Sequence, residues 1–143
     1  MIKIIGILIS SCSKRYKDIT KACHSINAEV IIISDDYNAE GLKWAAKESL
    51  CSFATGYTKF VRKNDLANGK KYEESQRYDD HVAAEERIFD FLVERSVDLL
   101  LVDDFEQEIT EDFIQKFGSD KIVDVESLKS DLTESIEHHL API

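Results

Sequence analysis

Five apolar segments recur along the chain, and amphipathic segments separate them. The first segment follows Lys3 and is apolar or glycine at every position through Ile9, without the alternation of a half-exposed strand. A strand of this kind is buried on both faces, which is typical of a parallel sheet covered by helices on both sides. The later apolar segments have the same character and lie at residues 28–34, 51–55, 97–102 and 121–125.

Apolar residues spaced three and four apart predict helices between these strands. We expect the helices at residues 14–25, 39–50, 79–95, 110–117 and 130–140, with Thr110 as the N-cap of the fourth. The helix 79–95 is expected to turn a set of apolar residues inward: Val82, Ile88, Phe89, Leu92 and Val93. Alternating strands and helices predict one α/β domain over residues 1–143, a Rossmann-like doubly wound parallel sheet. Together with the family resemblance described below, this alternation implies the strand order 3-2-1-4-5.

The composition is that of a soluble globular protein, with 43% apolar and 32% charged residues. No apolar run approaches the roughly 20 residues of a membrane helix, so we expect no membrane partner. The cysteines are Cys12, Cys23 and Cys51, an odd number without a C-x-x-C pair. This usage predicts reduced thiols and a cytoplasmic location.

The net charge of −10 is unevenly distributed along this acidic protein. Residues 1–77 carry +4 and residues 78–143 carry −14. Such asymmetry most often serves solubility, and the acidic half argues against a nucleic-acid partner, so we expect none. Within the first half, residues 56–77 form a long polar stretch rich in lysine and arginine. A loop of this length is either functional or mobile.

Ligands of doubly wound sheets bind beyond the carboxyl ends of the strands, which directs attention to residues 10–15. Carboxylates follow the other strands and are expected at the same edge: Asp35, Asp36, Asp103, Asp104, Asp124 and Glu126. Oxygen ligands of this kind bind Mg²⁺, but each pair equally fits turn chemistry facing water. For Asp35 and Asp36 we favour helix capping, and we assign no metal ligands.

Three segments together resemble a known enzyme family. Residues 7–10 and the turn after them match a strand and a G-x-G-S-N loop, and residues 33–42 (ISDDYNAEGL) match the family's second strand and its A-x-G-L helix start. Residues 96–114 resemble the segment VDLVVLAGFMRILSPEFV, and the spacing between the pieces agrees. Over residues 2–126 the chain thus resembles the N-terminal domain of glycinamide ribonucleotide formyltransferases, folate-dependent enzymes of purine biosynthesis.

The resemblance implies a phosphate loop that has changed its chemistry. Ser11 and Ser13 stand at the loop glycines, and Lys14 and Arg15 replace the following serine and asparagine. Lost glycines weaken backbone cradling of a phosphate, whereas two cations restore attraction for an anion. We therefore predict a phosphate or ligand site at Ser11, Ser13, Lys14 and Arg15, with Asp104 across the edge. The alternative is a solvated helix start.

Cys12 lies within the same loop. A position near a helix N-terminus and beside two cations is a setting that lowers a thiol pKa. A thiol without a functional role is the alternative that we favour.

The family's catalytic asparagine and histidine lie in the motif N-I-H-P-S-L-L-P. Asp124 and Glu126 stand at the matching positions, where a carboxylate would repel the oxyanion of the reaction. The folate-binding half of the family is expected to lie beyond the residues that align.

We therefore expect no catalytic residues and no formyl-tetrahydrofolate cofactor. This interpretation is that of a formyltransferase-like pseudoenzyme that binds a phosphorylated small molecule or a protein partner. The alternatives are a metal-dependent enzyme that uses the acidic strand ends, and an acidic interaction module that docks on a basic protein. The oligomeric state is left open.

Overall fold

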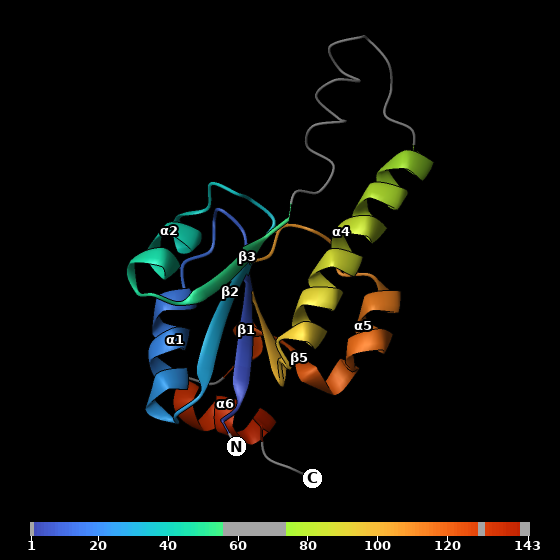
Figure 1. Ribbon diagram of the computed structural model, residues 1–143. Helices are drawn as coiled ribbons and strands as arrows, with labels where there is room; N and C mark the ends of the chain where they lie inside the picture. Colours follow the sequence, from blue (N-terminus) through green and yellow to red (C-terminus); the bar gives the residue numbers. More distant parts are fainter. Residues whose placement is uncertain (1, 56–73, 129–130, 141–143) are drawn as a thin grey trace.

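The computed structural model describes residues 2–55, 74–128 and 131–140. Strands and helices alternate along the chain, as the apolar pattern predicts (Figure 1). In chain order the elements are β1 (Ile4–Ile9), α1 (Tyr16–Ser25), β2 (Glu29–Ser34), α2 (Glu40–Lys47), β3 (Cys51–Ala54), α4 (Glu74–Glu94), β4 (Leu99–Asp103), α5 (Glu111–Phe117), the 3₁₀ turn η1 (Ser119–Lys121), β5 (Ile122–Asp124), the 3₁₀ turn η2 (Val125–Ser127) and α6 (Leu132–Leu140).

The five strands form one sheet in the order β3-β2-β1-β4-β5, and every neighbouring pair is parallel. The predicted order is therefore confirmed. β1 is the central strand, with Ile7 beside Ile32 of β2 on one side and Leu101 of β4 on the other. This placement explains why β1 lacks polar alternation: its neighbours shield its edges, and helices shield its faces.

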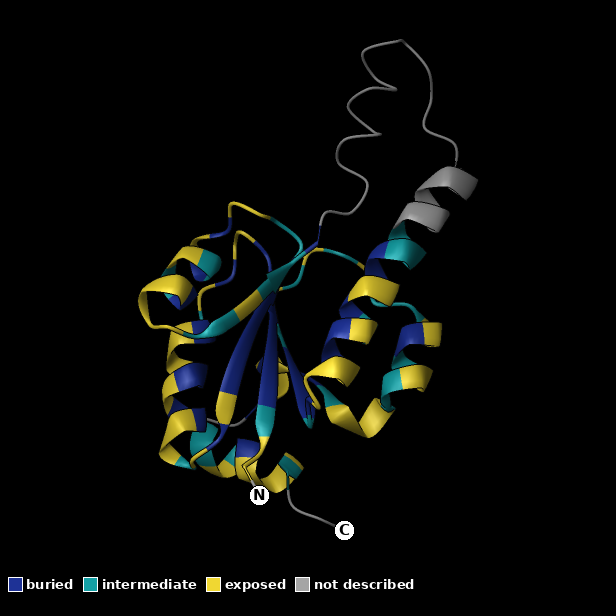
Figure 2. Ribbon diagram, in the orientation of Figure 1, coloured by how far each residue is buried: buried dark blue, intermediate teal, exposed yellow. Residues whose placement is uncertain are grey.

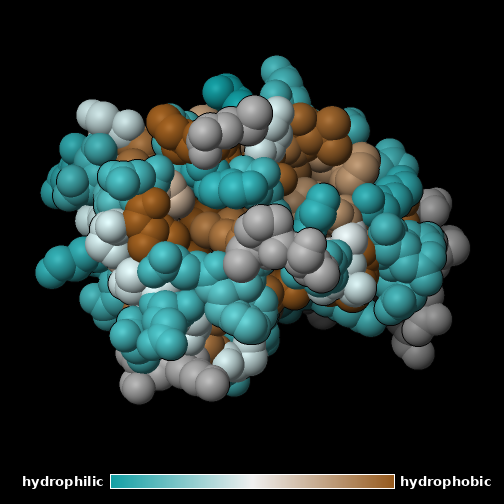
Figure 3. Space-filling model, turned by 90° about the horizontal axis from the view of Figure 1, so that it is seen from below, coloured by the Kyte–Doolittle hydropathy of each residue, from teal (hydrophilic) through white to brown (hydrophobic). Residues whose placement is uncertain are grey.

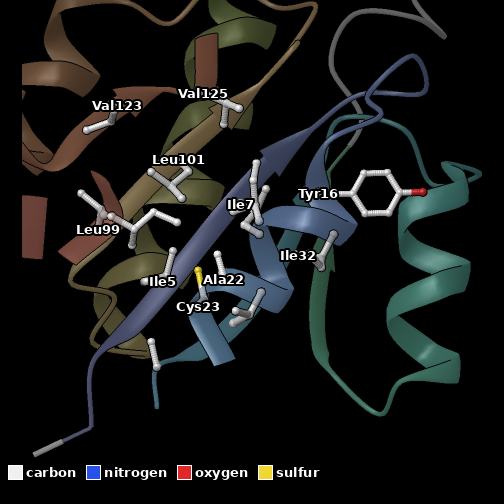
Figure 4. Packing of buried hydrophobic residues seen from close by; sticks show 14 of the residues in the cluster. Ile5, Ile7, Tyr16, Ala22, Cys23, Ile32, Leu99, Leu101, Val123 and Val125 are labelled. Carbon is white, nitrogen blue, oxygen red and sulfur yellow. The ribbon is translucent and has the colours of Figure 1, made fainter. Parts of the chain in front are cut away.

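Alternate residues of β1, β2, β4 and β5 enter two separate cores. Figure 2 shows that the strands are largely buried, and Figure 4 shows residues of one of the two cores. On one face, Ile5, Ile7 and Ile9 pack with residues of α1, α2 and α6. On the other face, Leu8 packs with residues of α4 and α5. Figure 1 shows α1 and α2 on one side of the sheet and α4 and α5 on the other. The sheet is thus covered on both faces, as expected.

Close packing of α2 on the sheet depends on Gly41. A Cβ at this position would lie 2.2 Å from Cδ1 of Ile9 and 3.4 Å from the ring of Tyr16. Real Cβ atoms do not approach other carbons so closely, so only glycine fits without movement of Ile9. The helix therefore lies nearer to the end of β1 than any other residue here would allow.

Several predicted boundaries are wrong by a few residues, because helix ends depend on tertiary contacts. α1 begins at Tyr16 instead of residue 14, and α4 begins at Glu74 instead of residue 79. α2 and α6 are shorter than predicted, and β4 is displaced toward Asp103. Val93, expected inside, is 58% exposed. It lies in the last turn of α4, next to the buried Leu92 but on the side of the helix that faces solvent.

Thr110 caps α5 as predicted, and its hydroxyl accepts a hydrogen bond from the backbone N–H of Phe113. The lysines and arginines of residues 56–73 lie outside the described residues, so the prediction of a basic loop is not addressed there. None of the described helices is both long and apolar enough to cross a membrane.

Candidate functional site

The carboxyl ends of the parallel strands meet at one edge of the sheet, called the carboxyl edge below. Ser10, Asp35, Asp103 and Asp124 mark the ends of β1, β2, β4 and β5 there. The first turn after β1 lies beside the loop after β4, because these strands pair directly. Most of the site residues predicted from the sequence are therefore neighbours in space.

Ser13 holds the first turn in place from inside the fold. Its buried hydroxyl accepts a hydrogen bond from the backbone N–H of Ser10 (2.9 Å) and donates a short one to the carbonyl of Asp103. The hydroxyl of Ser10 in turn accepts from the backbone N–H of Glu106 (2.8 Å). Both serines thus join the ends of β1 and β4, and the Ser13 hydroxyl is already engaged.

Asp103 places a carboxylate at the N-terminus of α1. Its Oδ2 accepts a hydrogen bond from the backbone N–H of Arg15 at 3.0 Å, although the side chain is only 1% exposed. Burial raises the pKa of this carboxyl, while hydrogen bonds from the Arg15 and Tyr16 backbones favour the charged form. Sequence reasoning placed Asp104 in the site and gave Asp103 no role of its own. The one available signal was a carboxylate that directly continues a buried apolar strand.

The remaining predicted site residues differ in how they are held. The guanidinium of Arg15 donates from Nη1 to the Val125 carbonyl at 3.2 Å, which ties the first turn to the end of β5. Ser11 is exposed, and its hydroxyl lies 3.5 Å from Oε1 of Glu106. Lys14 is also exposed. Asp104 is exposed and has a positive φ of 49°, a conformation that glycine adopts more readily. Binding of an anion to this group of residues stays a prediction.

The Cys12 thiol has a raised and not a lowered pKa, so the activating setting that the sequence offered as the less favoured alternative is not realised. The hydrogen bond to the Glu106 carboxylate contributes most to this rise, and a small desolvation of the exposed thiol comes next. The nearby Asp104 charge acts in the same direction. The acidic loop after β4 therefore outweighs the helix N-terminus and the two adjacent cations.

The end of β5 carries the two carboxylates that the resemblance aligns with asparagine and histidine. Asp124 Oδ1 accepts a hydrogen bond from the Glu126 backbone N–H at 2.9 Å and so caps the turn η2. Ser127 donates from its hydroxyl to the Asp124 carbonyl at 2.7 Å. Both acidic side chains are exposed, so the turn is built on a capping carboxylate.

The carboxylates after β2 have separate partners, and neither caps α2. Asp36 accepts from the backbone N–H of Asn38 (2.9 Å), which is a local turn, whereas α2 has Ala39 at its N-cap and no side-chain cap. The expected helix capping is therefore wrong, and the expected turn chemistry is confirmed. Asp35 Oδ2 accepts from Gln107 Nε2 at 3.1 Å.

Burial raises the pKa of Asp35, and its Oδ1 is buried without a protein hydrogen-bond partner. Gln107 comes from the loop after β4, and sequence reasoning did not identify it. Nowhere within the described ranges do three His, Cys, Asp or Glu side chains come close enough together to hold a metal ion. The acidic strand ends are held in separate turns instead.

A hollow of about 490 Å³ lies at the opposite, amino edge of the sheet. Figure 3 shows this face, where apolar patches lie among hydrophilic side chains. Ile4, Val30 and Leu50 are among the apolar residues that line it, and Glu94 and Arg95 are among the charged ones. None of the residues predicted to form the site lies there.

No family model matches the sequence, and no curated protein resembles it significantly in sequence. Solved structures do match the fold. Phosphoribosylglycinamide formyltransferase from Anaplasma phagocytophilum is 20% identical, with a TM-score of 0.59 over 96% of this chain and 57% of that one. The Brucella melitensis formyltransferase is 17% identical, with a TM-score of 0.64 over 87% and 56% of the two chains. Formyltetrahydrofolate deformylase from Burkholderia mallei is 11% identical, with a TM-score of 0.60 over 87% and 37%.

This chain therefore spans little more than half the length of the formyltransferases that it matches. The structural similarity to these enzymes agrees with the strand order and with the helices on both faces of the sheet. The chain has the α/β fold of the N-terminal domain of the glycinamide ribonucleotide formyltransferases.

Proposed function

We propose that this protein combines the formyltransferase fold with a binding function in place of formyl transfer. The observation that carries the proposal is the pair of carboxylates at the end of β5. Asp124 and Glu126 occupy the positions at which the resemblance places asparagine and histidine. Asp124 already accepts a hydrogen bond from the Glu126 backbone, and both side chains are exposed.

Formyl transfer passes through a tetrahedral oxyanion that preorganised donors stabilise, and loss of one donor typically lowers the rate by ~10²–10³. An ionised carboxylate accepts hydrogen bonds and donates none, so Asp124 does not replace an asparagine amide. A carboxylate is also a much weaker base than imidazole at neutral pH, which argues against Glu126 as general base. Formyl-tetrahydrofolate is therefore not an expected cofactor of this chain.

Charge at the carboxyl edge favours a basic partner. In the described loops that directly follow the strands, the cations are Lys14 and Arg15. The carboxylates of these loops and strand ends outnumber them: Asp35, Asp36, Asp103, Asp104, Glu106, Glu108, Asp124 and Glu126. Such an excess attracts cationic groups and repels phosphate. We infer that the partner is a protein segment or ligand that presents lysine-like positive charge to this edge.

A phosphorylated small molecule is the second candidate. Lys14 supports it, because its exposed ammonium group is a compact charge of the kind that binds phosphate. Two contacts stand against it: the Ser13 hydroxyl and the Arg15 backbone N–H both bond to Asp103. A positively charged partner, the first candidate, therefore agrees better with these contacts than a phosphorylated ligand does.

We also propose a cytoplasmic location. Cys12, Cys23 and Cys51 are all free thiols, which is the usual state of cysteine in a reducing compartment.

Fluorescence anisotropy with a labelled oligolysine peptide tests the binding proposal. We expect saturable binding at about 50 mM salt that weakens strongly at about 300 mM, because exposed charges are screened over distances of about 10 Å or less. The double variant Asp104→Asn/Glu106→Gln should weaken binding several-fold. The matched control Glu29→Gln/Glu94→Gln removes the same charge near the amino edge and should keep the affinity.

If both double variants lost affinity for the peptide to the same extent, net charge alone would attract the peptide, and the proposal would fail. The chemistry is tested separately with purified protein, glycinamide ribonucleotide and formyl-tetrahydrofolate. We expect no turnover above the reaction without protein. Turnover that disappears in Glu126→Gln would overturn the non-catalytic assignment.

A further inference from the structure

We infer that Asp103 is an internal anion: its carboxylate fills the N-terminus of α1, closes that position to an external phosphate, and leaves an anion site there when it is removed. The inference deepens the proposed function, because it explains why the carboxyl edge would reject phosphorylated ligands. It does not depend on whether a basic partner binds.

The position is one that α/β folds use for anions. Backbone N–H groups at a helix N-terminus are unpaired within the helix and attract negative charge, and this end of α1 follows the central strand of the sheet. Oδ2 of Asp103 lies 3.0 Å from the Arg15 backbone nitrogen, and the Tyr16 backbone N–H also donates to this carboxylate. The first two of the backbone donors that a phosphate would meet here thus already point at the Asp103 carboxylate.

The side chains of the turn before α1 do not cap the N-terminus of this helix. Helix N-termini are usually capped by a serine, threonine or aspartate of the same turn, but the N-cap residue of α1 is Arg15, whose side chain makes no cap hydrogen bond. Ser13, two residues earlier, directs its hydroxyl to the carbonyl of Asp103. A residue 88 positions later in the chain therefore caps the helix.

The carboxylate is held rigidly in place. Asp103 is the last residue of β4, pairs with Ile9 of β1, and has a side chain that is 1% exposed. The backbone carbonyl of Asp103 accepts the bond from Ser13 while its carboxylate accepts the bond from Arg15. An external anion must displace a buried group that is anchored at both of these points, and inorganic phosphate competes poorly with an anion that is already in place.

Removal of the carboxylate should expose donors and cations together. The backbone N–H of Arg15 would lose its partner, and Lys14 and Arg15 would add positive charge beside it. Loss of the negative charge of Asp103 would also lower the repulsion that a phosphate meets here. The variant should then bind inorganic phosphate, although the natural sequence does not.

The test is thermal unfolding in sodium phosphate and in sodium chloride at equal ionic strength. For Asp103→Ala we expect the Tm to rise saturably with phosphate, by about 9 °C at roughly 100 mM if the Kd is near 1 mM. The natural protein should show only the small, non-saturating rise that phosphate gives any folded protein because it is excluded from the protein surface. Asp104→Ala is the matched control: it removes one charge from the same loop, leaves the α1 N–H groups paired, and should behave like the natural protein.

Asp103→Ser supplies a second variant with a short side chain if Asp103→Ala does not fold, and its phosphate binding can be measured by calorimetry. A phosphate response of equal size in the natural protein would overturn the inference, because the site would then be open. An equal response in Asp104→Ala, or none in either Asp103 variant, would overturn it as well. None of these results bears on oligolysine binding by the natural protein, so the two proposals can fail separately.

Discussion

The carboxylate of Glu85 accepts two hydrogen bonds from Thr110, one from its backbone N–H at 2.8 Å and one from its hydroxyl at 2.5 Å. Glu85 lies in α4 and is only 6% exposed, while Thr110 is the N-cap of α5. The two helices that cover one face of the sheet are therefore joined by a buried carboxylate and not only by apolar contacts. This side chain also lies 3.7 Å from Nε2 of His81.

Replacement of Glu85 should destabilise the fold measurably. In Glu85→Ala the backbone N–H and hydroxyl of Thr110 lose their acceptor, which typically costs about 1–3 kcal/mol for a buried donor. Urea unfolding measures the change. Glu86→Ala, at the neighbouring exposed position, should change the free energy of unfolding by less than about 0.5 kcal/mol. Equal effects of the two substitutions would contradict a role for the contact with Thr110.

The packing of α2 against β1 predicts a strong effect of one added methyl group. In Gly41→Ala the new Cβ would lie 2.2 Å from Cδ1 of Ile9, and such overpacking typically costs about 1–3 kcal/mol. Ile9→Val removes that Cδ1 atom, so the double variant should recover part of the loss relative to the sum of the single variants. Strictly additive effects in urea unfolding would show that the two residues do not meet.

The raised pKa of Asp103 gives stability a pH dependence with a definite sign. Its folded pKa lies above its usual value of 3.8, so the folded protein keeps a proton that the unfolded chain releases. This contribution is complete below about 3.8 and is lost as pH rises through the folded pKa. The natural protein should therefore lose stability relative to Asp103→Asn as the pH rises above 3.8 and through the raised pKa of the folded state. Urea unfolding measures this effect. If the free energies of unfolding of the natural protein and Asp103→Asn differed by the same amount at every pH, the prediction would be contradicted.

The three thiols should differ in reactivity toward an alkylating reagent. Burial raises the pKa of Cys23 to about 12, and only the thiolate reacts. Cys12 is exposed, so at about pH 8 it should be labelled before Cys23, although more slowly than free cysteine because its pKa is also raised. Cys23 should react only after unfolding. Mass spectrometry of peptides from timed samples measures this order, and early labelling of Cys23 would show that its surroundings open in the folded state.

Short-range patterns in the sequence were enough to predict the architecture. The unbroken apolar run of β1 indicated a strand buried on both faces, and the structure places β1 at the centre of a covered parallel sheet. Thr110 was identified as a cap because its hydroxyl bonds to Phe113, only three residues away. Features that depend on neighbours within one turn, or on periodic burial, can be predicted from the chain alone.

The chemistry of the carboxyl edge was decided by contacts between residues far apart in the chain. Asp103 and Arg15 are 88 positions apart, and Glu85 and Thr110 are 25 apart. The pKa of Cys12 is raised chiefly by Glu106 across the edge, although its sequence neighbours alone would lower it. By itself the sequence determined which segments become strands and helices and in what order the strands lie. Only the tertiary structure decided which carboxylate meets which donor, because hydrogen bonding and burial depend on separations in space.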